Sequence, residues 1–368
     1  MSNAAADSTA AIQAELDSGK KVVELKDPLY LISRTLKIHS GQTLAAGRET
    51  RFLLAPGASC PLISNAGSDD RDICIDGGIW DYDNTRQAPN HWIGTDRLWT
   101  VREFEKDVPH GWVLKFRFVR GLTIRNMTIR NPASFSVALS DIDGFLVENL
   151  RFEQTTWNPV PLCMDGIHVN GNCHRGIIRN LTGKTYDDMV ALNADDSPEC
   201  SDSHGPISNI LIENVTGEHS YRFMRLQCTA DSVVENIRIR DIRGSFGSTG
   251  VLLSLFYVER NKYALFRNIT VEDMDIEITF PGGDSFGENG GIVVDDRTNV
   301  DGLTLRNLRF RMTNENPPDA FHISADSTVR NLCVENLAAE RPGRIPRSRC
   351  LIDDDNYTHM LEKTDGSK

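Results

Sequence analysis

The chain of 368 residues has no apolar run that could cross a bilayer. Its longest apolar stretch, from Val251 to Val258, is interrupted by Ser254 and is far shorter than the ~20 residues that a spanning helix needs. A basic excess is also missing, because 40 Lys and Arg stand against 52 Asp and Glu and give a formal net charge of −12. Since nucleic-acid binders carry a basic face, we expect neither a nucleic-acid partner nor a membrane partner.

Closely spaced cysteine pairs are absent as well. None of the eight cysteines belongs to a CxxC pair, which argues against a zinc site, and they are too sparse over this length for a disulfide framework.

Residues 1–6 resemble a cloning remnant or a disordered leader, and no apolar signal segment follows them. We therefore expect a secreted or periplasmic protein if a signal peptide has been removed, and a cytoplasmic protein otherwise.

One short phrase recurs along the chain: alternating apolar residues, then a charged residue, an asparagine and an aliphatic residue. Its asparagines are Asn126, Asn149, Asn180, Asn214, Asn236, Asn268, Asn307 and Asn331. Their spacings are 23, 31, 34, 22, 32, 39 and 24 residues, and the shortest of these correspond to one turn of a parallel β-helix. Repeats of this period are typical of a solenoid, in which each unit buries its apolar face by stacking on its neighbours.

The repeat predicts an all-β fold, a single-stranded right-handed parallel β-helix that forms one domain over residues 7–345. Leucine-rich repeats are the competing solenoid, but they need a denser leucine pattern and a more uniform spacing. Residues 7–16 have Ile12 and Leu16 four positions apart and Gly19 just beyond, which predicts a short capping helix over the first turn. Residues 346–368 are predicted to form a loosely packed polar tail, and a monomer is expected.

The densest group of polar residues lies on two consecutive repeats. Asp165 is followed 22 residues later by the adjacent pair Asp187 and Asp188. A spacing of one turn stacks the three carboxylates on one face, where they repel one another, so at least one should have a raised pKa. Glycoside hydrolysis needs this combination, because one protonated acid serves the leaving oxygen and one ionised base activates water. Elsewhere, the Asp195–Asp196 and Asp295–Asp296 pairs are expected to be solvated turns.

The following repeat carries Tyr221, Arg222, Arg225 and Gln227. Its guanidinium groups are placed to bind the carboxylate or the hydroxyls of a sugar.

All five tryptophans fall between positions 80 and 157, and residues 84–110 lack the repeat phrase. We expect that segment to be a long loop over one face, where aromatic side chains provide stacking surfaces for sugars.

These motifs resemble those of glycoside hydrolase family 28, the polygalacturonases and rhamnogalacturonases, within the pectin-lyase-like β-helix superfamily. Residues 164–167 (MDGI) resemble the Asn-Thr-Asp motif of the family, residues 187–192 (DDMVAL) its Asp-Asp motif, and residues 225–227 (RLQ) its Arg-Ile-Lys motif. Further similar segments lie at residues 7–13, 75–80 and 131–135, so the resemblance extends over roughly residues 7–340.

The resemblance implies an inverting, metal-free hydrolysis of a pectin-like polysaccharide or oligosaccharide, without a cofactor. Asp187 would be the general acid, Asp165 and Asp188 would activate water, and Arg225 would hold the sugar. In inverting enzymes the acid and base carboxyls lie ~6.5–9.5 Å apart.

The sequence departs from the family pattern at three places. Cys163 and Met164 replace Asn-Thr, Gln227 replaces the motif lysine, and Gly-His-Gly is absent. The histidine of the site could be His204, in Ser-His-Gly, or His168, in Asp-Gly-Ile-His, or neither. Because Gln227 removes a positive charge, a neutral sugar and an acidic sugar both remain open as substrates.

Two other classes of function also remain open. A β-helix polysaccharide lyase would use the three aspartates to hold Ca²⁺. A carbohydrate-binding β-helix without activity, such as an adhesin, would use the same face for recognition alone. The residues around Asp187 and Asp188 fit the hydrolase pattern better.

Overall fold

The computed structural model describes residues 6–90, 111–195, 204–229, 231–255, 262–279, 290–312, 318–339 and 350–352. The N-terminal part contains α1 (Thr9–Asp17), β1 (Val22–Leu25), β2 (Leu29–Ile32), β3 (Leu36–Ile38), β4 (Thr43–Ala46), β5 (Arg51–Leu54), β6 (Ile63–Asn65), β7 (Asp70–Asp76), β8 (Ile79–Asp81) and the 3₁₀ turn η1 (Asn84–Arg86). The middle contains β9 (Leu114–Arg130), β10 (Val137–Glu153), β11 (Ile167–Asn170), β12 (Cys173–Lys184), β13 (Asp188–Asn193), β14 (Ile207–Ser220), β15 (Arg222–Cys228) and β16 (Val234–Phe246). The last part contains β17 (Thr249–Leu255), β18 (Ala264–Ile278), β19 (Gly290–Val294), β20 (Thr298–Met312), β21 (Phe321–Ile323), β22 (Thr328–Ala338) and β23 (Cys350–Ile352).

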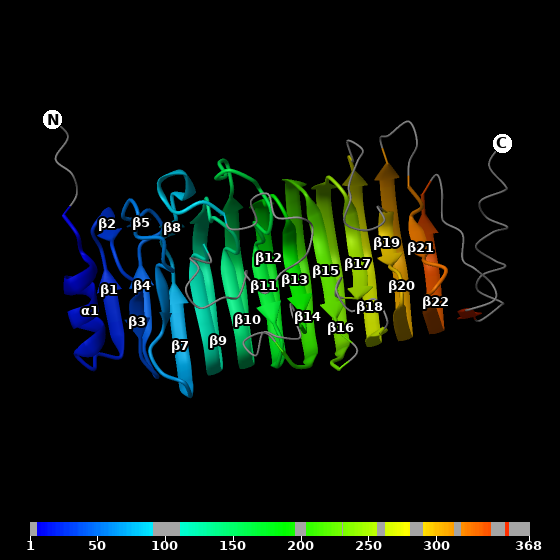
Figure 1. Ribbon diagram of the computed structural model, residues 1–368, viewed down its shortest axis with the longest axis horizontal. Helices are drawn as coiled ribbons and strands as arrows, with labels where there is room; N and C mark the ends of the chain where they lie inside the picture. The colour runs from blue at the N-terminus through cyan, green and yellow to red at the C-terminus, as the bar shows by residue number, and fades with distance from the viewer. Residues whose placement is uncertain are drawn as a thin grey trace.

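The strands stack as the turns of a parallel β-helix (Figure 1). Every strand pairs in parallel with the equivalent strand of the next turn, as in the series β10, β12, β14, β16, β18, β20 and β22. A second series, β11, β13, β15, β17, β19 and β21, forms another face of the same solenoid. The predicted parallel β-helix is therefore confirmed.

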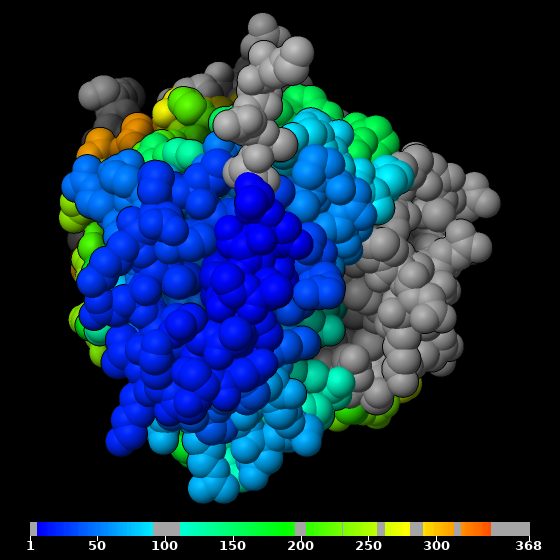
Figure 2. Space-filling model, turned by 90° about the vertical axis from the view of Figure 1, so that its left-hand side faces the viewer, coloured from blue at the N-terminus to red at the C-terminus, as the bar shows by residue number. Residues whose placement is uncertain are grey.

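The core is a continuous apolar column inside the solenoid. Inward-facing side chains such as Leu122 and Ile124 are almost completely buried, and one cluster extends from Ile12 to Leu337. Figure 2, a view of the N-terminal end, shows α1 lying across the first turn, where Ile12 and Leu16 are buried. The predicted capping helix is present because an uncovered first turn would expose this column to water.

Four of the repeated asparagines form a hydrogen-bonded row along one corner of the solenoid, whereas Asn236, Asn268 and Asn331 lie at a second corner. Asn126, Asn149, Asn180 and Asn214 have φ values of 59°, 58°, 56° and 53°, in the left-handed region that asparagine tolerates better than most residues. The side-chain amide of each donates to the side-chain oxygen of its predecessor, at 2.8, 2.8 and 2.7 Å. In this row, the asparagine therefore turns the chain and also ties its turn to the turn before it.

A charged residue stands just before this corner in successive turns, and these residues have their own order. Strand register places these residues side by side with alternating sign, as Arg125, Glu148, Arg179, Glu213, Arg240, Glu272, Arg306 and Glu335. Neighbours form ion pairs, for example Arg179 with Glu148 at 2.7 Å and Arg306 with Glu335 at 2.7 Å. If a turn were stacked on the next but one instead of on its immediate neighbour, arginine would lie beside arginine and glutamate beside glutamate. The alternation of charge therefore favours the observed order of the turns.

We expect Asn180→Ala to lower the free energy of unfolding by about 2–3 kcal/mol. It removes the side-chain hydrogen bonds to Asn149 and from Asn214, and it places an alanine at a positive φ that alanine tolerates poorly. Asn180→Gly is the matched control, since it loses the same bonds but tolerates the backbone, and about half the effect is expected. Denaturant unfolding measures both. Equal losses for the two variants would contradict the assigned backbone contribution.

The ends of the chain lie largely outside the described residues. Of the predicted leader at residues 1–6, only Ala6 is described. Of the predicted tail at residues 346–368, the structure describes β23, which pairs with β22. Among the described residues, no helix is long and apolar enough to span a membrane.

Candidate active site

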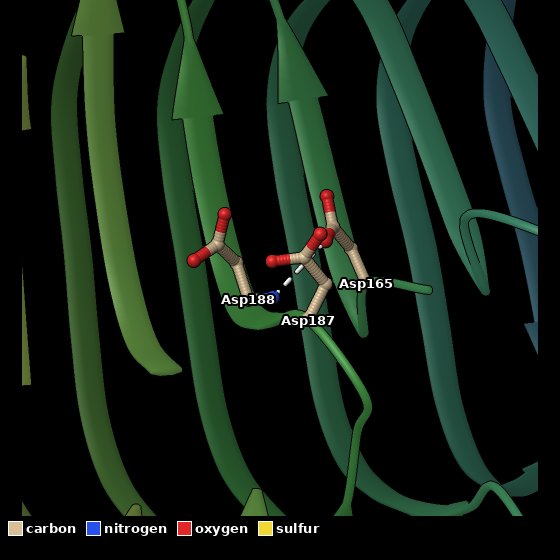
Figure 3. Close-up of side chains that lie close together, drawn as sticks. All are labelled: Asp165, Asp187 and Asp188. Carbon is tan, nitrogen blue, oxygen red and sulfur yellow. Dashed lines mark hydrogen bonds between the residues drawn. The ribbon is translucent and has the colours of Figure 1, made fainter. Parts of the chain in front are cut away.

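The three predicted carboxylates meet on the face formed by β11, β13 and β15. Asp165 lies just before β11, Asp187 just before β13, and Asp188 is the first residue of β13. Since β11 and β13 are paired in register, the turn before one strand lies beside the turn before the other. Figure 3 shows the carboxylates directed toward a common space. One oxygen from each lies within 4.8 Å of one oxygen from each of the others.

Asp165 is buried and has fixed partners. Its Oδ1 accepts a hydrogen bond of 3.1 Å from the backbone N–H of Asp188, and its Oδ2 lies 2.6 Å from Nδ1 of His168. Burial raises the pKa of Asp165, and the contact with His168 opposes that rise. The His168 ring is held in turn by Phe135, which stacks on it with 3.6 Å between ring centroids.

Asp187 is the most accessible of the three, with 21% of its side chain exposed against 4% for each of the others. Its Oδ2 accepts a hydrogen bond of 2.9 Å from the backbone N–H of Cys163. Burial, and next the negative charges of Asp188 and Asp165, raise the pKa of Asp187 to about 8. Asp187 is therefore a carboxyl group that keeps its proton at neutral pH and reaches the surface.

Asp188 is paired with arginine from the next turn. Strand register places it beside Arg222, whose Nη1 donates a hydrogen bond of 2.8 Å to Asp188 Oδ1. Arg222 Nη1 is also 3.7 Å from Asp187 Oδ1, and Arg225 Nε is 3.7 Å from Asp188 Oδ2. Arg222 is 1% exposed, and the Asp188 carboxyl group is its partner at the shorter distance inside the protein.

The other predicted site residues differ in their relation to the carboxylates. Tyr221 lies against Arg222, with its ring centroid 5.3 Å from the guanidinium carbon. Gln227 is 2% exposed and lies in register with Asn193 at the far end of β13. His168 is 3% exposed and bonded to Asp165, so its place in the structure is beneath the site, as a support for that carboxylate.

His204 contacts a different aspartate. Its Nδ1 pairs with Oδ1 of Asp195, which also accepts hydrogen bonds from the backbone and hydroxyl of Thr229. Asp195 was expected in a solvated turn, but it is 0% exposed. That expectation was wrong because Asp195 ties the end of β13 to Thr229, beyond β15, and its oxygens are used in that connection.

Sequence reasoning missed the aromatic support of the site. Trp112 stacks on Phe135 at 5.9 Å between centroids, and Phe135 stacks on His168. Of the other tryptophans, Trp80 is fully buried against Phe52 and Trp157 is 45% exposed. The predicted aromatic loop lies mostly outside the described residues, since residues 91–110 are not among them.

The carboxylate separation is narrower than we expected. An inverting site typically holds acid and base ~6.5–9.5 Å apart, whereas here one oxygen of each carboxylate lies within 4.8 Å of one oxygen of each of the others. The reason is the architecture, because adjacent strands of a sheet are spaced about 4.8 Å apart and place Asp165 directly beside the Asp187–Asp188 pair.

The same cluster has the ligand type of a calcium site, since three carboxylates converge. However, the Arg222 guanidinium already lies against Asp187 and Asp188, at 3.7 and 2.8 Å. A divalent cation shared by these carboxylates would be repelled by this buried positive charge. The residues present therefore fit an arginine-compensated acid cluster better than a metal centre.

No family model matches the sequence, and no curated protein matches it either. Among solved structures, the polygalacturonase of Erwinia carotovora subsp. carotovora aligns with a TM-score of 0.58 at 14% identity, over 92% of this chain and 96% of that one. Endopolygalacturonase I of Stereum purpureum, complexed with two galacturonate, aligns with a TM-score of 0.56 at 15% identity, over 92% and 98%. The Streptococcus pneumoniae surface protein and adhesin PfbA aligns with a TM-score of 0.56 at 13% identity, over 94% and 96%.

The chain has the pectin-lyase-like parallel β-helix fold. At identities of 13–15%, the similarity establishes the fold and leaves family membership open. Because polygalacturonases and an adhesin share the pectin-lyase-like fold, the fold does not decide between catalysis and binding. That choice depends on the chemistry of the carboxylate cluster.

Proposed function

We propose that the protein is a glycoside hydrolase that cleaves O-glycosidic bonds of a pectin-like polysaccharide or oligosaccharide. The observation that carries the proposal is the division of the cluster into one accessible carboxyl, Asp187, and two buried carboxylates with fixed partners, Asp165 and Asp188. Hydrolysis of an acetal needs this division, since the leaving oxygen must receive a proton while water loses one.

In the proposed reaction Asp187 is the general acid. Its pKa of about 8 keeps it protonated at neutral pH, and its partial exposure lets it approach a glycosidic oxygen. As the bond between the anomeric carbon and this oxygen breaks, Asp187 transfers its proton to the leaving group. Arg222 Nη1, 3.7 Å away, then stabilises the carboxylate that Asp187 becomes.

Water is the proposed nucleophile. A water molecule with hydrogen bonds of about 2.8 Å can bridge two oxygens up to about 5.6 Å apart, and one oxygen of Asp165 lies within 4.8 Å of one oxygen of Asp188. The two carboxylates can therefore hold one water between them, and Asp188 accepts its proton as the oxygen bonds to the anomeric carbon. The hydrogen bond of 2.8 Å from Arg222 holds the Asp188 carboxyl group in a fixed position for this role.

The exposure of the side chains favours a single displacement over a covalent intermediate, in spite of the narrow carboxylate separation. A retaining enzyme needs an ionised carboxylate that bonds directly to the anomeric carbon. Asp165 and Asp188 are only 4% exposed, so a water molecule reaches the sugar more readily than either of them does. We therefore expect inversion, and proton NMR of the first product released should show the anomer opposite to that of the substrate; retention would contradict the assigned roles.

We also expect chelation to leave the activity unchanged. The buried charge of Arg222, 3.7 Å from Asp187 and 2.8 Å from Asp188, would repel a divalent cation shared by them, so the proposed hydrolysis uses no metal. Product release would be measured before and after dialysis against a chelator, and after Ca²⁺ is restored. A loss of activity that Ca²⁺ reverses would favour the lyase alternative.

A further inference from the structure

An exposed tryptophan and a lysine lie beside the residue that precedes the acid. Tyr186 is adjacent to Asp187 in the chain, and its ring contacts Trp157 edge-on with 5.0 Å between centroids. Lys184 Nζ lies over the Tyr186 ring, 4.6 Å from its centroid. Trp157 is 45% exposed. We call Trp157, Lys184 and Tyr186 the Trp157 patch.

The backbone that carries Trp157 is firmly held. Asn131 Oδ1 accepts hydrogen bonds from the backbone N–H groups of Thr155 and Thr156, at 2.8 and 3.3 Å. Asn84, which is 0% exposed, donates to the carbonyl oxygen of Thr156 at 2.7 Å, and Asn158 donates to the carbonyl oxygen of Asn84 at 3.1 Å. The indole is thus presented to solvent by a fixed loop, which lowers the entropy cost of packing a ligand against it.

Lys184 has a charge that no described carboxylate pairs with. Its neighbour across the strands is Glu153, but Glu153 pairs with Arg130 at 2.6 Å and with Arg151 at 3.2 Å. Arg222 and Arg225, in contrast, each lie against the carboxyl group of Asp188. Among the described residues around Asp187, Lys184 is therefore the cation best placed to bind an anionic group of a ligand.

We propose that the Trp157 patch is a subsite for a sugar ring that carries a carboxylate. The apolar face of the ring packs on Trp157, and the carboxylate binds the ammonium group of Lys184. This inference deepens the proposed function, on which it rests for the presence of a glycan. It assigns the recognition of acidic sugars to Lys184, at the end of β12. An acidic sugar bound there lies next to the bond that Asp187 protonates.

The test uses the full-length Asp187→Asn variant, which should bind an oligosaccharide without cleaving it. Its affinities for trigalacturonic acid and for the neutral methyl ester of this trisaccharide are measured by titration calorimetry. We expect the acid to bind about three- to tenfold more tightly at low salt, and the difference to shrink as salt is added. Adding Lys184→Met should abolish the preference while the ester binds as before. Adding Trp157→Ala should weaken both ligands by about tenfold. Lys26→Met, which changes a lysine with 81% side-chain exposure, is the matched control and should change neither.

Three results would overturn this inference: equal affinity for the acid and the ester, an acid preference that survives Lys184→Met, or no binding of either trisaccharide. The proposed function is tested separately, by the release of reducing ends from the same trisaccharides with the unsubstituted chain. An acid preference that depends on Lys184, without any release, supports the subsite and contradicts the hydrolase. Release of reducing ends without an acid preference supports the hydrolase and overturns the subsite.

Discussion

Asp187→Asn should lower kcat by about 10²- to 10⁴-fold, because the amide cannot transfer a proton to the leaving oxygen. The fold should survive, since the substitution keeps the size of the side chain. In the unsubstituted protein, activity should decline as the pH rises through about 8, where Asp187 loses its proton. Initial rates across the pH range, on a substrate that the protein cleaves, measure both effects.

Stability provides an independent check on the same residue. The folded-state pKa of Asp187 is raised from 3.8 to about 8, so the folded protein holds a proton that the unfolded chain releases. The contribution of Asp187 to the free energy of unfolding is therefore fully present below about pH 4, and it is lost as the pH rises through about 8. Asp187→Asn should remove that decline. Asp231→Asn, at a side chain that is 65% exposed, is the control and should leave the decline intact. Full activity of Asp187→Asn would contradict its role as the acid.

Arg222→Met should lower the free energy of unfolding by about 3–5 kcal/mol, because it leaves the buried carboxylate of Asp188 without its compensating charge. Activity should fall as well, since Arg222 also faces Asp187. The double variant Asp188→Asn with Arg222→Met removes both charges and should recover much of the stability, although it should remain inactive.

Denaturant unfolding of the four proteins in this cycle measures the coupling between Asp188 and Arg222. Arg175→Met is the matched control, because Arg175 is 66% exposed in its pair with Asp143 and a change within about 0.5 kcal/mol is expected. If Arg222→Met costs no more than Arg175→Met, the pair does not hold the cluster together as we describe.

The fold was predictable because its signals are local and repeated. Each repeat asparagine marks a left-handed turn, and the apolar residues before it alternate, which predicts the strands and their buried side. The register followed from the spacing only in part, because Asn214 lies beside Asp241, and Asn236 lies beside Asn209 at a second corner. The same spacing brought Asp165 together with Asp187 and Asp188. The strands before residue 82 were not predicted individually, since they lack the asparagine phrase, and the larger core residues there, such as Phe52 and Trp80, have no periodic signal.

The parts of the site that escaped prediction depend on side-chain partners. His204 follows a plausible motif, but its partner is Asp195, which no spacing rule identifies. The complete burial of Arg222 and the stacking of Phe135 on His168 arise from packing between turns that are distant in sequence. The carboxylate separation was also missed, because the expected value came from enzymes in general and the spacing of adjacent strands is narrower.

The most direct test of the central claim is the fate of solvent oxygen. A panel of pectic oligosaccharides would be incubated with the protein in water enriched in oxygen-18, and the products analysed promptly by mass spectrometry, with Asp187→Asn as the blank. Hydrolysis at the Asp165, Asp187 and Asp188 cluster predicts one oxygen-18 atom in the new reducing end of each product pair, and none with Asp187→Asn. Unsaturated products without the label, or bound oligosaccharide that is never cleaved, would contradict the account.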